Sequence, residues 1–162
     1  MSDLERRIAR LEAESEIRRL KARYLNACDA KDIDAIRECY IEKGAEIVFP
    51  PIGTFHDREG LVEIFTQLAA TTPIIDSHQA HNAEINVIDE NNAEARWSLA
   101  FVTYHPELKT FRLLSNFYHD RYVRTEKGWR IAYSRSEPRL IFDGKVTDAN
   151  GVEIANIPAP TA

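Results

Sequence analysis

The sequence predicts an α+β domain in which N-terminal helices pack on one side of a curved mixed or antiparallel sheet. Three observations lead to this fold class. Apolar residues recur at helical spacing up to Leu68, whereas from Ala83 onwards they alternate with polar residues as in strands. Helices followed by a run of strands are typical of the α+β class. The chain has 162 residues, of which 44% are hydrophobic, and this supports one domain with a sizeable core.

Helical periodicity predicts a first helix over residues 1–30. Its apolar residues form two series, Leu4, Ile8 and Leu11, followed by Ile17, Leu20, Tyr24 and Cys28. Because the step from Leu11 to Ile17 does not continue one stripe, we expect either a break near residues 14–15 or two faces that contact different neighbours. The arginines of this segment alternate with glutamates, which favours a solvated helix face over a basic binding patch.

Shorter elements connect this helix to the sheet. Asp32 is a suitable cap for a second helix that extends to Tyr40. Residues 45–49 have the pattern of a strand that ends at two consecutive prolines. A third helix is expected to begin at residues 57–60 and to bury apolar side chains as far as Leu68.

Four strands are predicted in the second half, over residues 83–87, 93–101, 110–124 and 129–142. Turn-forming residues lie between the first two and between the last two, so these strands should pair as antiparallel hairpins. The third strand has two faces, one with Phe111, Leu113 and Phe117 and the other with Leu114, Asn116, Tyr118 and Tyr122. We assign residues 1–145 to the domain and residues 146–162 to an extended C-terminal arm.

Charge and composition argue against several functional classes. The formal net charge is −5 and basic residues are interspersed with acidic ones, so nucleic acid is not an expected partner. No apolar run approaches the ~20 residues that span a bilayer, and the charged N-terminus lacks the apolar segment of a secretory signal. Cys28 and Cys39 form no CxxC motif, which fits a reducing compartment. We therefore expect a cytoplasmic protein without a membrane partner.

The sequence contains no motif for a common cofactor. Its six glycines form neither a dinucleotide-binding GxGxxG nor a phosphate-binding P-loop. Asp76, His78 and His81 could suggest a metal site, but they precede an expected strand and no further ligand cluster adjoins them. We expect chemistry that needs no metal, flavin or nucleotide.

Two features are unusual for residues that only form a core. Asp29 lies at the end of the first helix, where the helix dipole disfavours an anion. The segment SHQAHN, over residues 77–82, stands directly before an apolar strand. Each has a simpler explanation when taken alone: a solvated acid at the start of a loop, and a histidine that caps or bonds locally.

Taken together, these segments resemble a known family. Residues 17–29 (IRRLKARYLNACD), the spacing of His78 and Asn82, and residues 118–129 (YHDRYVRTEKGW) are similar to the SnoaL-like family of the nuclear-transport-factor-two-like superfamily. The resemblance extends over residues 5–142, and the family includes dehydratases and a dehydrochlorinase. It implies a cone-shaped α+β barrel in which helices and a curved sheet enclose one apolar pocket.

The resemblance also implies a catalytic Asp–His pair, in which Asp29 orients His78 and His78 acts as the base. Tyr24 matches a tyrosine that some members carry five residues before the aspartate. His81 is an alternative to His78, although its spacing from Asn82 does not fit the family. A buried carboxylate can fix the imidazole tautomer, so that Nε2 removes a proton next to a leaving group or carbonyl.

Several members use an arginine late in the last strand. Arg135 is the first candidate for this role, because it alternates onto the same face as Trp129 and Ile131, and Arg139 is the second. The residues expected to shape the substrate pocket are Trp97, Phe101, Leu114, Asn116 and Tyr118.

We therefore predict a cofactor-independent lyase of the dehydratase or elimination type, or an isomerase, that acts on a hydrophobic aromatic or polycyclic small molecule. One alternative is a non-catalytic ligand-binding or accessory protein of the same fold, since a fold does not fix a function. Another is a partner-binding module that uses the outer sheet face. Because the family's members are homotrimers or dimers, a homo-oligomer is expected, with a trimer favoured.

Overall fold

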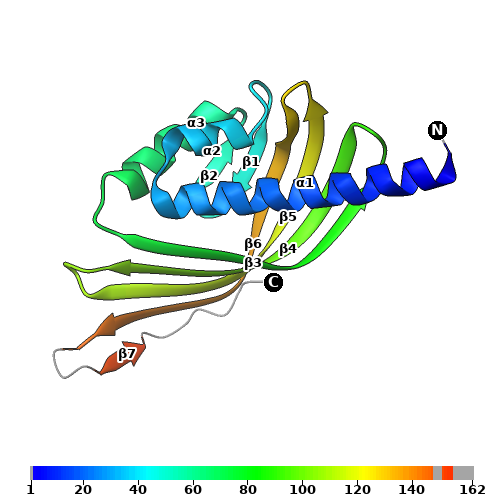
Figure 1. Cartoon of the computed structure of the whole chain (residues 1–162). Coiled ribbons are helices and arrows are strands. Elements are labelled where there is room, and N and C mark those ends of the chain that lie inside the picture. Colours follow the sequence, from blue (N-terminus) through cyan, green and yellow to red (C-terminus); the bar gives the residue numbers. More distant parts are fainter. Residues whose placement is uncertain (1, 148–150, 155–162) are drawn as a thin grey trace.

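Three α-helices lie on one face of a curled sheet in the computed structural model, which describes residues 2–147 and 151–154 (Figure 1). The helices of this described part are α1 (Asp3–Ala30), α2 (Ile33–Cys39) and α3 (Arg58–Phe65), and α3 continues into a π-helical turn, η1 (Thr66–Ala70). The long strands all follow from Ile75 onwards. The predicted α+β class is therefore confirmed.

The first helix is continuous over its whole length, so the break that we considered does not occur. It begins with a capping box between Ser2 and Glu5, which satisfies two backbone N–H groups. Its C-terminal half packs on the sheet and buries the second apolar series, whereas Leu4, Ile8 and Leu11 remain 47–65% exposed. In Figure 1 the N-terminal turns project beyond the sheet, which explains why the two series have different surroundings.

Aspartates begin the two shorter helices, as predicted. The side chain of Asp32 accepts a hydrogen bond from the Ala35 N–H at 3.0 Å, and that of Asp57 accepts one from the Gly60 N–H at 2.8 Å. Each bond satisfies a donor that the helix cannot pair internally. The starts of α2 and α3 are thus fixed by local sequence.

The described residues form seven strands: β1 (Glu46–Phe49), β2 (Gly53–Phe55), β3 (Ile75–Val87), β4 (Asn92–His105), β5 (Thr110–Thr125), β6 (Gly128–Val146) and β7 (Val152–Ile154). Their order is β2-β1-β6-β5-β4-β3, and β7 pairs with β6. The β1–β6 pair is parallel and the other pairs are antiparallel, so the sheet is mixed. It curls beneath the helices but stays unclosed, because β2 and β3 form its two ends.

Strand β3 begins at Ile75, well before the predicted position. Its first residues are mostly polar, so they give no hydrophobic signal of a strand. A bulge between His81 and Glu84 interrupts the pairing with β4, and Asn82 adopts a left-handed φ of 49° there, a conformation that asparagine tolerates. His78 therefore lies inside a strand, and not in a loop before it.

A bulge also decides which residues of β6 face the helices. The pairing of β5 with β6 shifts register at Ala132, which is one extra residue in β6. One extra residue reverses the alternation beyond it. Ile131 is buried before the bulge, whereas beyond it Ser134 is buried and Arg135 is exposed.

The core between α1 and the sheet contains an ion pair. The Lys21 ammonium donates to Asp120 Oδ2 at 2.8 Å, and both side chains are at most 1% exposed. Asp120 also accepts hydrogen bonds at 2.7 Å from the hydroxyls of Tyr122 and Ser134. The indole of Trp97 in turn donates to the Tyr122 hydroxyl at 3.0 Å. These bonds supply the partners that a buried charge requires.

Apolar side chains also lie on the surface of the chain. Besides the N-terminal turns of α1, the residues Val102, Leu113 and Leu140 on β4, β5 and β6 are 40–43% exposed. Such surfaces favour association, and the homo-oligomer stays a prediction. None of the described helices is long and apolar enough to cross a membrane.

The predicted C-terminal arm is described at residues 146–147 and 151–154. Val146 ends β6, and the short strand β7 folds back to pair with it. The rest of the arm lies outside the described residues.

Candidate functional site

A mainly apolar cavity lies between the helices and the sheet. Its volume is about 220 Å³, just below the range of about 300–1,000 Å³ that is typical of ligand pockets. Helix α1 contributes Tyr24 and Cys28, α3 and η1 contribute apolar side chains, and the sheet contributes His78, Phe101 and Tyr118. An apolar cavity with a few polar groups in its wall is the usual form of a small-molecule site.

Asp29 and His78 meet at the wall of this cavity. Asp29 lies in the last turn of α1 and His78 in β3, 49 residues further along the chain. Asp29 Oδ1 lies 2.6 Å from His78 Nδ1, and the carboxylate also accepts the backbone N–H of His78 at 3.0–3.1 Å. Because an ionised carboxylate can only accept, Nδ1 carries the hydrogen and Nε2 keeps its lone pair. The imidazole of His78, which lines the cavity, therefore has a basic nitrogen, Nε2, that does not bond to Asp29.

The surroundings of His78 set its charge. Burial lowers the pKa of His78 below its ordinary value of 6.5, although the hydrogen bond and negative charge of Asp29 oppose this shift. The imidazole is therefore neutral at neutral pH, which is the state that can accept a proton. The Phe101 ring lies against it, with the two ring centres 4.3 Å apart, and shields one side from water.

Two buried tyrosines line the same cavity. Burial raises the pKa of Tyr24 well above its ordinary value, and it raises that of Tyr118 as well. Both phenols therefore keep their proton and can donate a hydrogen bond. Lys21 Nζ lies 3.7 Å from the centre of the Tyr118 ring, and Tyr40 meets the Tyr24 ring edge-on at 5.4 Å. These contacts hold both rings in place.

A second polar pair in this region was not predicted from the sequence. Lys31 ends α1 in a left-handed conformation with φ 59°, and its ammonium forms an ion pair with Oδ2 of Asp76. Asp76 lines the cavity. Its position two residues before His78 could have indicated this, because alternate residues of a strand share a face. Among the described residues, no group of three or more His, Cys, Asp or Glu side chains is placed to hold a metal ion.

The structure places the remaining predicted lining residues beside the cavity but outside its wall. Trp97 donates to a core tyrosine, and Asn116 donates to the Ser136 hydroxyl at 2.5 Å. Leu114 lies opposite Phe101 in the β4–β5 ladder, so it shares that face of the sheet. The expectation that these three side chains line the cavity is therefore wrong.

Arg135, Arg139 and His81 are exposed and do not reach the cavity. The bulge in β6 turns Arg135 outward, and Arg139 lies over the ring of Phe117 at 4.9 Å. His81 lies at the bulge of β3. This corrects the expectation that an arginine of the last strand faces the cavity. Lysines lie beside the cavity wall instead: Lys31 pairs with Asp76 and Lys21 lies over the Tyr118 ring.

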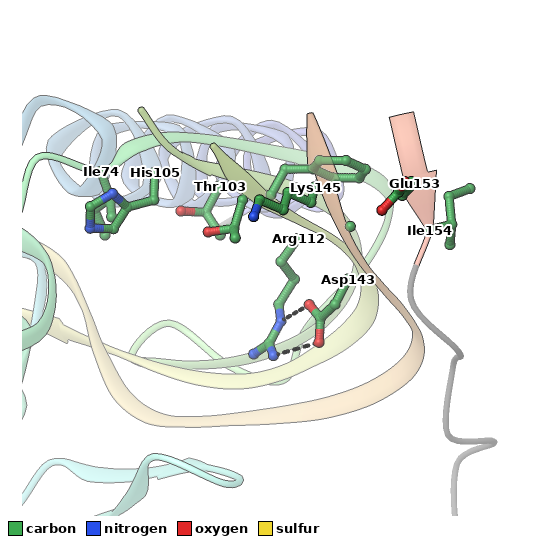
Figure 2. Close-up of a pocket in the computed structure, with 11 residues that line it drawn as sticks. Ile74, Thr103, His105, Arg112, Asp143, Lys145, Glu153 and Ile154 are labelled. Carbon is green, nitrogen blue, oxygen red and sulfur yellow. Dashed lines mark hydrogen bonds and ion pairs between the residues drawn. The ribbon is translucent and has the colours of Figure 1, made fainter. Parts of the chain in front are cut away.

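A larger groove adjoins the cavity through Ile74 and Thr103, which line both. Its volume is about 690 Å³, and it extends along the ends of β4, β5 and β6 beside β7 (Figure 2). Arg112 and Asp143 face each other there in an ion pair with hydrogen bonds of 2.6 and 2.9 Å. These two charges satisfy each other, and Lys145, Glu153 and His105 also line the groove.

Helices and a curled, unclosed sheet around one cavity define the nuclear-transport-factor-two-like class of α+β proteins. The model of the SnoaL-like domain family matches residues 9–135, and the chain belongs to this family. The resemblance inferred from the sequence is thereby confirmed. No curated protein sequence matches the chain.

Solved structures share this fold over nearly the whole chain. A scytalone dehydratase-like protein from Novosphingobium aromaticivorans is 18% identical, with a TM-score of 0.76 over 95% of this chain and 97% of its own. A type 3 hexachlorocyclohexane dehydrochlorinase from Novosphingobium barchaimii is 15% identical, with a TM-score of 0.73 over 91% and 93%. A nuclear-transport-factor-two-like protein from Novosphingobium aromaticivorans is 23% identical, with a TM-score of 0.69 over 83% and 86%.

Proposed function

We propose that this protein is a cofactor-independent lyase that removes a leaving group from a hydrophobic small molecule, with the Asp29–His78 pair as its general base. The observation that carries the proposal is the 2.6 Å contact between Asp29 and His78 Nδ1 in the wall of an apolar cavity. The similar structures of a scytalone dehydratase-like protein and a hexachlorocyclohexane dehydrochlorinase support an elimination. Double-bond migration by the same base is the related isomerase reaction.

The chemistry follows from the proton positions. Nε2 of His78 takes a proton from a carbon next to the one that bears the leaving group. The electrons of that C–H bond form the new C=C bond, and the leaving group departs with the electrons of its own bond. Asp29 accepts a hydrogen bond from Nδ1–H throughout the reaction and stabilises the imidazolium, without itself taking up the proton. The proton returns to solvent or to the leaving group when the product leaves.

Neutral phenols take the place of the arginine that we expected. Tyr24 and Tyr118 keep their protons because burial raises both pKa values. Either hydroxyl can donate a hydrogen bond to a departing oxygen or to a carbonyl oxygen that becomes negative, which stabilises the transition state. The lining by aromatic and aliphatic side chains supplies affinity for an apolar ring.

The cavity limits the size of the substrate. A volume of about 220 Å³ favours a compound of one or two rings. A polycyclic substrate would have to pass Ile74 and Thr103 and extend into the adjoining groove of about 690 Å³. We therefore expect one- and two-ring aromatic or alicyclic compounds to be the better substrates.

The proposal is tested with His78→Ala and Asp29→Asn on a panel of halogenated and hydroxylated one- and two-ring compounds, with product measured by mass spectrometry. General base catalysis is typically worth about 10²–10⁴-fold, so kcat should fall by about that factor in His78→Ala. Asp29→Asn should lower kcat and change its pH profile, because the partner that fixes the tautomer is altered.

The partly exposed pair of His119 and Glu137, whose side chains meet at 3.1 Å, provides a control. His119→Ala and Glu137→Gln change a histidine and a carboxylate that do not line the cavity, and they should leave turnover unchanged. Full activity in both His78→Ala and Asp29→Asn would contradict the proposal. Tight binding of panel compounds by the wild type without any turnover would favour a ligand carrier of the same fold.

A further inference from the structure

One carboxylate oxygen in the cavity wall has no partner. The Asp76 side chain is 4% exposed, and its Oδ2 is occupied by the Lys31 ammonium. Its Oδ1 is buried and accepts no hydrogen bond from any group in the described part of the chain. Leaving a buried polar atom without a partner destabilises the folded state, so this oxygen is an acceptor that a ligand can satisfy.

Three elements hold the carboxylate in place. The ion pair joins Asp76 in β3 to Lys31 at the end of α1. The Lys31 ammonium also lies 5.6 Å from the ring centre of Phe65 at the end of α3, and Phe65 lines the cavity. Because Oδ2 is fixed from outside, rotation of the carboxyl group is restricted, and Oδ1 is preorganised to receive a donor.

The position of Asp76 relative to His78 is also set by the strand. Residues i and i+2 of a strand point to the same face and are about 6.6 Å apart. A donor bound by Asp76 would therefore lie roughly one aromatic ring from the imidazole. A hydroxylated ring held in this way presents its far side to Nε2 of His78.

We propose that Asp76 is a specificity-determining residue that accepts a hydrogen bond from a hydroxyl group of the ligand, so that the cavity selects phenols and ring alcohols over the parent hydrocarbons. This inference rests on the proposed function in taking the cavity as the substrate site. A site built to bind a hydroxyl rejects the analogue that lacks it, because the polar group of the site then stays unpaired. Lys31 is the positioning residue of this carboxylate.

The test compares the affinities for 2-naphthol and naphthalene, measured by isothermal titration calorimetry on the full chain. The ratio of the two dissociation constants separates the hydroxyl contact from the apolar contacts, which both ligands share. A hydrogen bond to a charged group contributes about 1.5–3 kcal/mol, so the wild type should favour 2-naphthol by about 10- to 150-fold. Asp76→Ala should reduce this preference to about threefold or less.

Glu84→Ala is the matched control. Glu84 is also a strand carboxylate paired with a cation, Arg96, but it lines neither the cavity nor the adjoining groove and should leave the preference unchanged. Asp76→Asn preserves the shape of the side chain and gives an intermediate preference, which keeps the test valid where Asp76→Ala does not fold. Circular dichroism of each variant establishes the folded state.

An unchanged preference in Asp76→Ala or Asp76→Asn, or no preference in the wild type, overturns the inference. Failure of this inference can be told apart from failure of the proposed function. The proposed function is tested by the loss of turnover in His78→Ala, whereas this inference is tested by the ratio of the dissociation constants for naphthalene and 2-naphthol. If His78→Ala loses turnover while Asp76→Ala keeps the wild-type ratio, the role of His78 as the base is supported and the role of Asp76 as the hydroxyl acceptor is refuted. The reverse pair of results supports the acceptor and refutes the base.

Discussion

Removing Lys21 should destabilise the protein more than removing any surface charge. The ammonium lies 2.8 Å from Asp120, and both side chains are at most 1% exposed. In Lys21→Met the aliphatic stem is replaced by a similar volume, while the Asp120 carboxylate stays buried without its counter-charge. Breaking a buried ion pair in this way costs about 3–5 kcal/mol.

The size of the effect on melting temperature follows from chain length. For a protein of about 150–250 residues, 1 kcal/mol shifts the melting temperature by about 2–4 °C. Lys21→Met should therefore lower it by roughly 6–20 °C. Adding Asp120→Asn should recover much of this loss, because the uncompensated charge is gone. The amide oxygen can still accept from Ser134, which bonds Oδ1 of Asp120, and the amide NH2 can donate to the Tyr122 hydroxyl, which bonds Oδ2.

Urea unfolding followed by circular dichroism measures the free energies of unfolding, and thermal unfolding measures the melting temperatures. All variants are compared at one chain concentration, because association of chains changes the apparent stability. Glu16→Gln is the control, since Glu16 forms an ion pair with Arg124 at 2.9 Å in which the side chains are 48% and 41% exposed. Exposed pairs contribute about 0–1 kcal/mol. The reasoning is refuted if Lys21→Met costs no more than this control, or if the double variant is less stable than Lys21→Met.

Three further predictions concern other groups. Burial raises the pKa of the Cys28 thiol to about 12, so a thiol reagent at pH 8 should label Cys28 only after unfolding, and rapid labelling of the native protein would contradict this. Because burial lowers the pKa of His78, the folded state binds this proton less readily than the unfolded state. The contribution of His78 to the free energy of unfolding should thus be complete above its unfolded-state pKa near 6.5, and it should be lost as pH falls from there toward the folded-state pKa. An NMR titration that gives a folded-state pKa of His78 above 6.5 would contradict this pH dependence. In Gly144→Ala the new Cβ would lie 2.3 Å from the Phe111 ring and 2.8 Å from the Glu153 carbonyl of β7, so hydrogen exchange in residues 152–154 should accelerate, and unchanged protection there would argue against it.

Local sequence predicted the three helices, the first strand and the four long strands in the order in which they occur, but not β2 or β7. Asp32 and Asp57 begin helices as their residue type predicts, and the alternation of residues 93–101 places them in a strand whose apolar residues face the core. The pair of Asp29 and His78 was also inferred from sequence, through the resemblance to a family. The structure places these two side chains in contact, and their role in turnover stays a proposal.

Sequence alone led to the wrong face for Arg135. Its alternation with Trp129 and Ile131 assumes a regular strand, but an extra residue at Ala132 reverses the faces beyond it. Nothing in the residue types around Ala132 marks the bulge, because its position is set by how β6 pairs with β5. The same limit applies to β3, where polar residues hid the start of the strand.

The sequence by itself determined the fold class and the helix starts, because periodicity and capping act between residues that are close in the chain, whereas the pair of Asp29 and His78 was inferred only through the resemblance to a family. Only the tertiary structure decided how the polar groups are paired. Asp76 meets Lys31 across 45 residues and Asp120 meets Lys21 across 99. Such partners are chosen by strand register and by the docking of α1, which depend on the packing of the whole chain. The unpaired oxygen of Asp76, from which we infer the ligand chemistry, is likewise a feature of the tertiary structure and could not be predicted from the sequence.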